Sequence, residues 1–237
     1  MNSKGKLYLI PTRLGDNPPL EVLPISIKKI IENIDDYIVE NEKTARRFIK
    51  RVSPNKSQPS LNLQVLNKYT SEAEKNTFLN ACQEGTSIGL LSEAGCPAIA
   101  DPGSDIVSLA HQMDIRVIPL VGPSSILLAL MASGMNGQGF TFNGYLPIDK
   151  SERKSKLKAL ERLSFENHQA QIFIETPYRN MKMLEDLAST LQPNTRLCVA
   201  CDLTLPTEFI KTKPAQDWLK NKEDLHKRPS IFIIQKD

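Results

Sequence analysis

The sequence predicts an α/β protein of two domains, the first of which has a mostly parallel sheet with helices on both faces. The first observation behind this prediction is a strand–loop–helix unit that occurs twice between residues 87 and 134. Its strands are the apolar runs at 88–91 and 115–121, and each run leads into a loop rich in Gly, Pro and Ser. The second observation is that strand and helix patterns alternate along the first half, which favours a parallel sheet covered by helices.

A third observation sets the predicted domain boundary. The pattern resets between Met135 and Phe140 with the segment Asn-Gly-Gln-Gly, which is typical of a hinge. We therefore expect an N-terminal α/β domain at 1–136 and a second α/β domain at 137–237.

The elements of each predicted domain follow from the spacing of their apolar residues. Ser71 and Glu74 have the spacing of a capping box at the start of a helix. In the first domain, besides the two units above, strands are expected at 6–12, 37–40 and 62–69, and helices at 22–34, 43–52 and 72–84. In the second domain, strands are expected at 140–146, 170–175, 196–203 and 230–235, and helices at 151–163, 180–191 and 214–221.

Composition indicates a globular protein of ordinary charge. Hydrophobic residues make up 40% of the chain and charged residues 24%, and the net charge of +3 permits a polyanionic partner without requiring one. The N-terminus has no signal-peptide pattern, and the uncharged apolar segment at 117–134 contains two prolines. We therefore expect a cytoplasmic protein with no membrane span.

The cysteines do not indicate a metal site. Cys198 and Cys201 have the C-x-x-C spacing, but they lie in an apolar run predicted to be a strand. Residues three apart on a strand point to opposite faces, so the two thiols would not converge on one ion. We expect reduced, buried cysteines and no bound metal.

The familiar nucleotide and hydrolase motifs are missing from the sequence. No G-x-G-x-x-G follows the first strand, and neither a P-loop motif nor a G-x-S-x-G elbow occurs. The two loops after the strands at 88–91 and 115–121 are the alternative ligand sites, because loops at the carboxyl ends of strands hold ligands in α/β folds. Gly95, Gly103 and Gly122 would let the backbone approach a small polar molecule there.

Four segments carry a resemblance to a known family. They are LSEAGCPAIADPG at 91–103, VGPSSI at 121–126, FTFNGYLP at 140–147 and IETPYR at 174–179, with TRLGD at 12–16 and ENEKT at 40–44 as weaker matches. With these motifs in order, the chain resembles the tetrapyrrole-methylase-like family of S-adenosylmethionine-dependent methyltransferases. Within that family it is most similar to the ribosomal RNA small-subunit (cytidine-2′-O) ribose methyltransferase branch.

This resemblance implies two α/β domains with S-adenosylmethionine in the cleft between them, and a homodimer. By analogy, the loop after the strand at 88–91 would wrap the methionine part of the cofactor, and residues of the second domain would close over the adenosine. The implied cofactor-binding residues are Leu14, Gly95, Cys96, Pro97, Ile99, Ser124, Ser125, Ile126, Ile174 and Ala200.

The chain departs from the branch at three places. Arg13 stands where the branch usually has proline, Asn41-Glu42-Lys43 stand for Asp-Thr-Arg, and residues 201–205, Cys-Asp-Leu-Thr-Leu, stand for Arg-Glu-Leu-Thr-Lys. These changes concern the RNA substrate more than the cofactor. They keep two alternatives open, which are methylation of a small molecule such as a tetrapyrrole and a catalytically silent paralogue that binds cofactor or RNA.

Methyl transfer to a ribose hydroxyl needs a placed acceptor and a group that takes the proton. Glu175, at the end of a predicted strand, is the favoured general base, with Asp101, Asp202 and Glu93 as other candidates. A helix-capping role for Glu175 is an equal alternative. Arg179 has the geometry to bind a phosphate bidentately, or to pair with Glu175 instead.

Basic helix faces indicate where RNA would bind. Lys43, Arg46, Arg47 and Lys50 recur at helical spacing, and positions 154, 158 and 162 repeat the pattern on a later helix. Each face alone is also what a solvated helix surface looks like. Together with the resemblance, they predict an S-adenosylmethionine-dependent methyltransferase that acts on a ribose 2′-hydroxyl of small-subunit ribosomal RNA.

Overall fold

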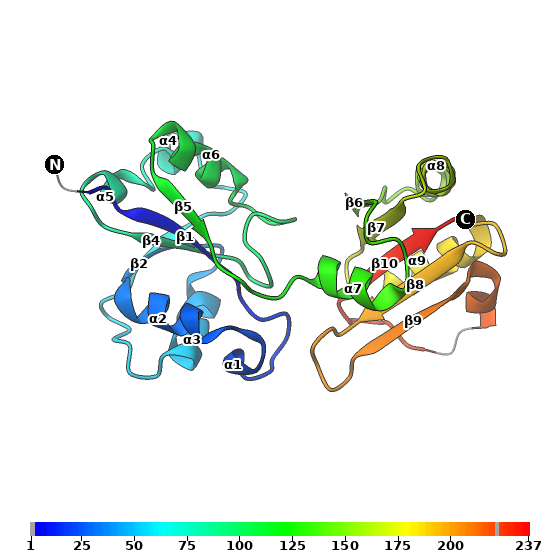
Figure 1. Ribbon diagram of the computed structural model, residues 1–237, viewed down its shortest axis with the longest axis horizontal. Coiled ribbons are helices and arrows are strands. Elements are labelled where there is room, and N and C mark those ends of the chain that lie inside the picture. The colour runs from blue at the N-terminus through cyan, green and yellow to red at the C-terminus, as the bar shows by residue number, and fades with distance from the viewer. Residues whose placement is uncertain (1–2, 221–222) are drawn as a thin grey trace. The chain divides into compact units, whose positions relative to one another are not determined.

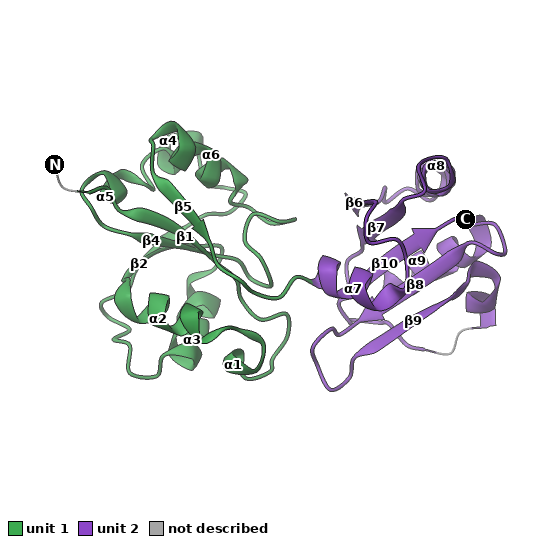
Figure 2. Cartoon of the chain, viewed as in Figure 1, with its two compact units in different colours: residues 1–124 green, residues 125–237 purple. Residues whose placement is uncertain are grey.

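A computed structural model describes residues 3–220 and 223–237, and the chain forms two compact units, Met1–Ser124 and Ser125–Asp237 (Figure 1, Figure 2). The sheet of the first unit has five strands in the order β3-β2-β4-β1-β5, and every neighbouring pair is parallel. The strands are β1 Lys6–Ile10, β2 Asp36–Val39, β3 Asn62–Val65, β4 Ile88–Leu91 and β5 Arg116–Pro119. The predicted α/β class with a parallel first sheet is confirmed.

Helices cover both faces of this sheet because successive strand residues point to opposite sides. On one side Ile10 and Tyr37 pack under α1, α2 and α3, and on the other Leu7 and Ile38 pack under α5 and α6. The helices are α1 Pro19–Val22, α2 Ile25–Asn33, α3 Glu42–Val52, α4 Glu72–Lys75, α5 Asn80–Gln83 and α6 Ser104–Gln112. All six lie between parallel strands as crossover segments.

Two predicted helices of the first unit are shorter than expected. The predicted helix 22–34 begins at Ile25, because Pro24 holds an extended conformation and ends α1 ahead of it. The predicted helix 72–84 is divided into α4 and α5, and the Thr77 hydroxyl donates 2.7 Å to the Glu74 carbonyl at the break. The capping box at the start of α4 is present as predicted.

The second unit has a mixed five-stranded sheet in the order β6-β7-β10-β8-β9. Strands β6 and β7 are parallel, and the other neighbours are antiparallel. The strands are β6 Phe140–Tyr145, β7 Ala170–Ile174, β8 Arg196–Cys201, β9 Phe209–Pro214 and β10 Ser230–Gln235. Helices α8 Lys150–Asn167 and α9 Asn180–Thr190 pack with the 3₁₀ helix η1 Ala215–Lys220 on one core, which includes Phe173, Val199 and Phe232.

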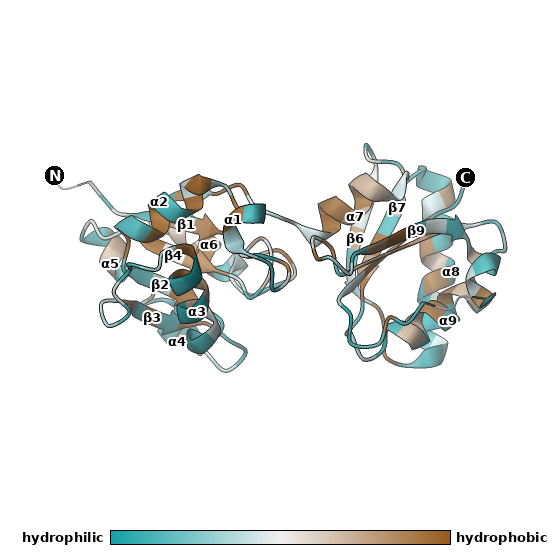
Figure 3. Cartoon of the chain, turned by 90° about the horizontal axis from the view of Figure 1, so that it is seen from below, coloured by the Kyte–Doolittle hydropathy of each residue, from teal (hydrophilic) through white to brown (hydrophobic). Residues whose placement is uncertain are grey.

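Helix α7, Ser125–Ser133, packs against β8, β9 and β10 of the second unit. It is almost wholly apolar, brown to tan in Figure 3, and the Thr212 hydroxyl of β9 donates 2.8 Å to its Ser133 carbonyl. The boundary between the two compact units therefore lies before α7, between residues 124 and 125, whereas the predicted boundary between residues 136 and 137 follows α7. The predicted hinge residue Asn136 is itself held in the second unit by the His168 carbonyl, 2.7 Å away.

The strand β9 is absent from the sequence-based expectation. Its sequence, FIKTKP, lacks the apolar run of the other strands and ends in a proline. The predicted helix 214–221 is the 3₁₀ helix η1, and its last residue, 221, lies outside the described residues. In the described ranges, no helix combines the length and the apolar character that crossing a bilayer requires.

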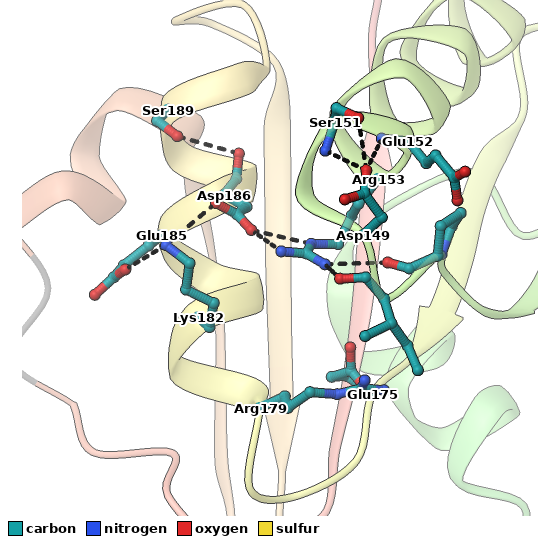
Figure 4. A network of polar contacts seen from close by, with 12 residues as sticks. Asp149, Ser151, Glu152, Arg153, Glu175, Arg179, Lys182, Glu185, Asp186 and Ser189 are labelled. Carbon is teal, nitrogen blue, oxygen red and sulfur yellow. Dashed lines mark hydrogen bonds and ion pairs between the residues drawn. The ribbon is translucent and has the colours of Figure 1, made fainter.

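A buried ion pair joins α8 to α9 (Figure 4). The Arg153 Nε donates 3.0 Å to Asp186 Oδ2, and its Nη1 donates to the carbonyls of Pro147 and Ile148 at 3.1 and 2.6 Å. Both side chains are less than a tenth exposed. Burial acts to raise the pKa of Asp186, but the hydrogen bond and charge of Arg153, with Lys182 nearby, outweigh it and hold that pKa below its usual value.

Candidate functional site

The loop that follows β4 is joined to the segment that follows β1. The Thr12 amide donates 2.9 Å to the Gly95 carbonyl, and the Gly95 amide donates 3.2 Å back to the Thr12 carbonyl. Gly95 has φ +77°, and a Cβ there would lie 3.1 Å from Leu14 Cδ2 and 3.3 Å from the Pro123 carbonyl oxygen. A side chain at this position would therefore be strained and crowded.

Two alanines in the same loop adopt a left-handed conformation. Ala98 has φ 65° and Ala100 has φ 62°, which a residue with a Cβ rarely adopts. Ile99 between them is 52% exposed, although Pro97 is buried. Such strain costs on the order of 1–3 kcal/mol per residue and concentrates at functional sites.

The loop after β5 closes on the same region. Gly122 passes so near Pro11 that a Cβ would lie 2.2 Å from the proline Cβ. The Cys96 thiol donates a hydrogen bond to the Pro123 carbonyl at 3.5 Å. The loops after β1, β4 and β5 therefore form one contacting group in the first unit.

The remaining predicted cofactor residues lie at the unit boundary and in the second unit. Ser124 ends the first unit, and Ser125 and Ile126 begin α7. Ile174 is the last residue of β7 and is partly buried, and Ala200 is fully buried in β8 opposite Ile231. An accessible side chain is thus present at Ile174 but not at Ala200.

A crevice of about 200 Å³ opens beside this loop group, at the carboxyl ends of β1 and β4. Thr12 and Leu14 line it from the segment after β1, Glu93 from the end of β4, and Arg47 and Phe48 from α3. The hydroxyl of Thr12 is buried and has no hydrogen-bond partner within the described part of the chain. Thr12 belongs to the weaker motif at 12–16 but is given no role of its own in the sequence-based prediction, because whether a hydroxyl is paired depends on the folded structure.

Three carboxyl groups, those of Glu40, Glu93 and Asp101, gather near the crevice. The Glu93 amide donates 3.3 Å to Glu40 Oε1, and the Thr44 hydroxyl donates 2.6 Å to Glu93 Oε1. Burial raises the pKa of Asp101, and the negative charge of Glu93 raises it further. The pKa of Glu40 is raised by burial first and then by the charge of Asp101.

Glu175, the predicted base, lies directly after β7 with its side chain 2% exposed. Its Oε1 accepts from the Thr176 amide at 2.6 Å. It also accepts from Arg179 Nε at 3.0 Å and from Arg179 Nη2 at 2.5 Å, and Figure 4 shows the two side chains together. Helix α9 begins after Arg179 without any side-chain cap. Of the alternatives that the sequence leaves open, the ion pair between Arg179 and Glu175 is therefore the arrangement observed.

Asp202, another candidate base, is also engaged. Its Oδ2 accepts from Arg228 Nε at 2.8 Å and from the Thr207 hydroxyl at 2.9 Å. The segment 201–205 lacks the cations of the resembling branch, and Arg228 from the loop before β10 places a cation beside this carboxylate.

The basic face of α3 divides into engaged and available cations. Arg46 donates to Glu42 Oε1 at 2.9 Å and to the Gln58 carbonyl at 2.6 Å, and Lys50 donates to the Pro54 carbonyl. Lys43 and Arg47 are exposed, and their side chains have no hydrogen-bond or ion-pair partner among the residues described. Only part of the predicted face is therefore available to an anion.

Metal binding has no structural support in the described residues, where no group of three or more His, Cys, Asp or Glu side chains is placed to hold an ion. Cys198 and Cys201 are buried free thiols, and burial raises the pKa of each.

Comparison with known proteins gives a consistent pattern. Residues 26–218 match the sequence profile of the tetrapyrrole (corrin/porphyrin) methylases. The ribosomal RNA small subunit methyltransferase I of Escherichia coli O157:H7 is 29% identical over 99% of this chain and 79% of its own length. The protein of the same name from Haemophilus influenzae is 30% identical over 98% of this chain and 78% of its own length.

Solved structures share the fold at low sequence identity. A diphthine synthase superposes with a TM-score of 0.68 at 12% identity, over 98% of this chain and 90% of that one. The uroporphyrin-III-C-methyltransferase of Thermus thermophilus superposes with a TM-score of 0.55 at 17% identity, over 98% and 92%. At these identities the likeness concerns the fold.

Proposed function

The chain belongs to the tetrapyrrole (corrin/porphyrin) methylase family, and from this premise we propose that it transfers a methyl group from S-adenosylmethionine to a ribose 2′-hydroxyl of small-subunit ribosomal RNA. It is a methyltransferase of that family. The RNA acceptor is supported by relatives named ribosomal RNA small subunit methyltransferase I, which match 98–99% of this chain at 29–30% identity. The observation within the structure that supports it is the group of contacting loops after β1, β4 and β5.

The loop after β4 fits the cofactor that this family uses. Gly95 leaves a small space, here called the cradle, that a Cβ would fill. Ala98 and Ala100 hold the backbone of the same loop in a strained, left-handed conformation. Gly95 to Ile99 would hold the methionine part, with Leu14 beside them. Ser124, Ser125, Ile126, Ile174 and Ala200 complete the proposed cofactor residues.

The bound cofactor supplies a methyl group on a sulfonium, which needs no further activation. The residues of the chain then have to hold the acceptor in line with the methyl group and exclude water. A proton must also leave the ribose hydroxyl. Glu175 is the sequence-predicted group for this step, but its Oε1 already accepts three hydrogen bonds, so we propose that it positions Arg179 instead of taking the proton.

RNA would be held by cations of both units. Lys43 and Arg47 on α3 are exposed and have no side-chain partner among the described residues, and Arg179 in the second unit is one-third exposed despite its ion pair. Arg46 and Lys50 belong to the same proposed face, but their internal hydrogen bonds give them a structural role as well.

The proposal includes a homodimer in the cytoplasm. Leu127 and Met131 of α7 are 50% and 79% exposed, and their i, i+4 spacing places them on one helix face. Exposed apolar faces of this kind commonly mark an interface. Analytical ultracentrifugation tests this part, with a mass twice the 26.5 kDa of the chain as the expected result.

The experiment that tests the function is transfer of a radiolabelled methyl group from S-adenosylmethionine to isolated small ribosomal subunits. We expect label in the ribosomal RNA and none in ribosomal protein or in a uroporphyrinogen added as competitor. Label in the porphyrinoid alone would overturn the RNA acceptor. Calorimetry with S-adenosylmethionine tests the cofactor separately, with Gly95→Trp as the variant that fills the cradle.

A further inference from the structure

The crevice beside Gly95 lies where the chain connections of the first sheet change direction. From β1 the chain crosses to β2 on one side, and from β4 it crosses to β5 on the other side, while β1 and β4 are neighbours. Ligands in open parallel sheets bind at such a point, outside the carboxyl ends of the two strands. Thr12 and Glu93, which line the crevice, come directly after these two strands.

The crevice also adjoins the proposed methionine loop. Thr12 lines the crevice and exchanges two backbone hydrogen bonds with Gly95, at 2.9 and 3.2 Å. Leu14 lines the same crevice and would be the first side-chain contact of a Cβ added at Gly95. A molecule in the crevice would therefore lie next to the residues proposed to hold the methyl donor.

The crevice contains polar groups suited to a hydroxyl. Thr12 is 5% exposed, and its Oγ1 is buried without a partner among the described residues. Buried hydroxyls are usually paired, since leaving one unpaired lowers stability, and the exceptions call for an explanation such as a ligand. Glu93, which also lines the crevice, is exposed, and its carboxylate accepts from the Thr44 hydroxyl at 2.6 Å.

The available cation of the crevice is Arg47. Arg13, which also lines it, pairs with Asp16 at 2.7 Å and donates to the Asn17 carbonyl at 2.5 Å. Asp16 additionally pairs with Arg51. Arg47 is exposed with no side-chain partner in the described ranges, so its guanidinium can bind a phosphate bidentately.

We propose that this crevice is the acceptor subsite and takes one nucleotide of single-stranded RNA, with Arg47 on a backbone phosphate and with Thr12 and Glu93 on the ribose hydroxyl. The proposal rests on the proposed function for the identity of the reaction. It assigns the recognition of RNA over DNA to Thr12 and Glu93, because the 2′-hydroxyl is the group that distinguishes the two at a given site.

The test compares the binding of short fluorescent oligocytidines, in ribo and deoxyribo form, to the full chain. Wild type should prefer the ribo form. Thr12→Val should abolish the preference without lowering the midpoint of thermal unfolding, because it removes only an unpaired hydroxyl. Thr12→Ser, which keeps the hydroxyl, should retain the preference.

Arg47→Ala should weaken the binding of both oligonucleotides about tenfold, as expected for the loss of one charge-assisted contact. It should also reduce the slope of log affinity against log salt concentration by about 0.7. The matched control is Arg116→Ala, an exposed arginine at the amino end of β5 with no partner in the described part of the chain. Its oligonucleotide binding should equal that of wild type. Inorganic phosphate should compete with both oligonucleotides without changing the ribo preference.

The results separate the subsite from the function. An unchanged ribo preference in Thr12→Val, or equal weakening by Arg47→Ala and Arg116→Ala, would overturn the subsite. If wild type methylates small subunits and both crevice variants do so at the wild-type rate, the subsite is wrong and the function stands. If wild type transfers no methyl group but Thr12→Val still abolishes a ribo preference, the function is wrong and the subsite stands.

Discussion

Glu175→Gln is expected to lower the stability of the second unit and to slow methyl transfer less than tenfold. The carboxylate is 2% exposed, and its Oε1 accepts one backbone and two guanidinium hydrogen bonds. This arrangement holds the side chain in place as the partner of Arg179. It is the arrangement of a structural ion pair, and it opposes the removal of a proton from a substrate through Oε1.

The size of the stability loss follows from those bonds. Glutamine still accepts from the Thr176 amide and from Arg179, but it loses the charge, and a hydrogen bond to a charged group is worth about 1 kcal/mol more than a neutral one. Two guanidinium bonds would give about 2 kcal/mol. Arg179 is 33% exposed, so solvent screening reduces this to about 1 kcal/mol. The unfolding midpoint should fall by roughly 2–4 °C.

The assay pairs differential scanning calorimetry with the rate of methyl transfer at saturating cofactor. Arg179→Met is the companion variant, because it leaves the buried carboxylate without its cation and should lower stability more than Glu175→Gln does. If Glu175→Gln instead slows methyl transfer by a factor of about 100 or more while the unfolding midpoint is unchanged, this reasoning is refuted. That result would establish the carboxylate as the general base.

Three further predictions concern the cofactor loop, the buried ion pair and α3. Gly95→Ala should lower stability by about 1–2 kcal/mol, since a Cβ is strained at φ +77°. It should also weaken S-adenosylmethionine binding by calorimetry, because the Cβ occupies the proposed cradle, and affinity equal to that of wild type would contradict the cradle. Asp186→Asn should lower the free energy of unfolding by about 3–5 kcal/mol, because it leaves the Arg153 cation buried without its partner. Because the pKa of Asp186 is lowered in the folded state, wild type should lose the stabilisation from this pair as pH falls below about 4. Urea denaturation of both proteins at pH 7 and pH 3 checks this, and an equal difference in unfolding free energy at the two pH values would contradict it. Lys43→Ala should weaken RNA binding without a change in stability, whereas Arg46→Ala should lower stability, because Arg46 donates a hydrogen bond from α3 to the Gln58 carbonyl. Gel shift measures the binding and calorimetry the stability. Equal effects of the two variants in both assays would contradict the division of the basic face of α3 into engaged and available cations.

The first sheet could be predicted from the sequence because its strands are short apolar runs between clear loop signals. The run at 88–91 is buried at every position, and the loop after it has the glycines that a close backbone approach requires. The capping box at Ser71 and Glu74 could be predicted equally well, since its two hydrogen bonds are local. Local features of this kind can be predicted because the residues that determine them are close together in the sequence.

What could not be predicted depends on contacts between distant residues. Strand β9 is polar and pairs with β8, so its identity as a strand comes from its neighbour. Helix α7 has the same apolar pattern whichever unit it packs on, and only its contact with β10 decides the boundary. The unpaired hydroxyl of Thr12 and the internal bonds of Arg46 likewise exist only in the folded chain.

The most direct test of the central claim maps the methyl group on the RNA. Small subunits incubated with the protein and S-adenosylmethionine should yield ribosomal RNA with one new position that resists alkaline hydrolysis, because a 2′-O-methyl group removes the internal nucleophile of strand cleavage. Gly95→Trp should leave that position cleavable. Labelled RNA that remains fully cleavable by alkali would show that the methyl group is not on a ribose, and would contradict the account.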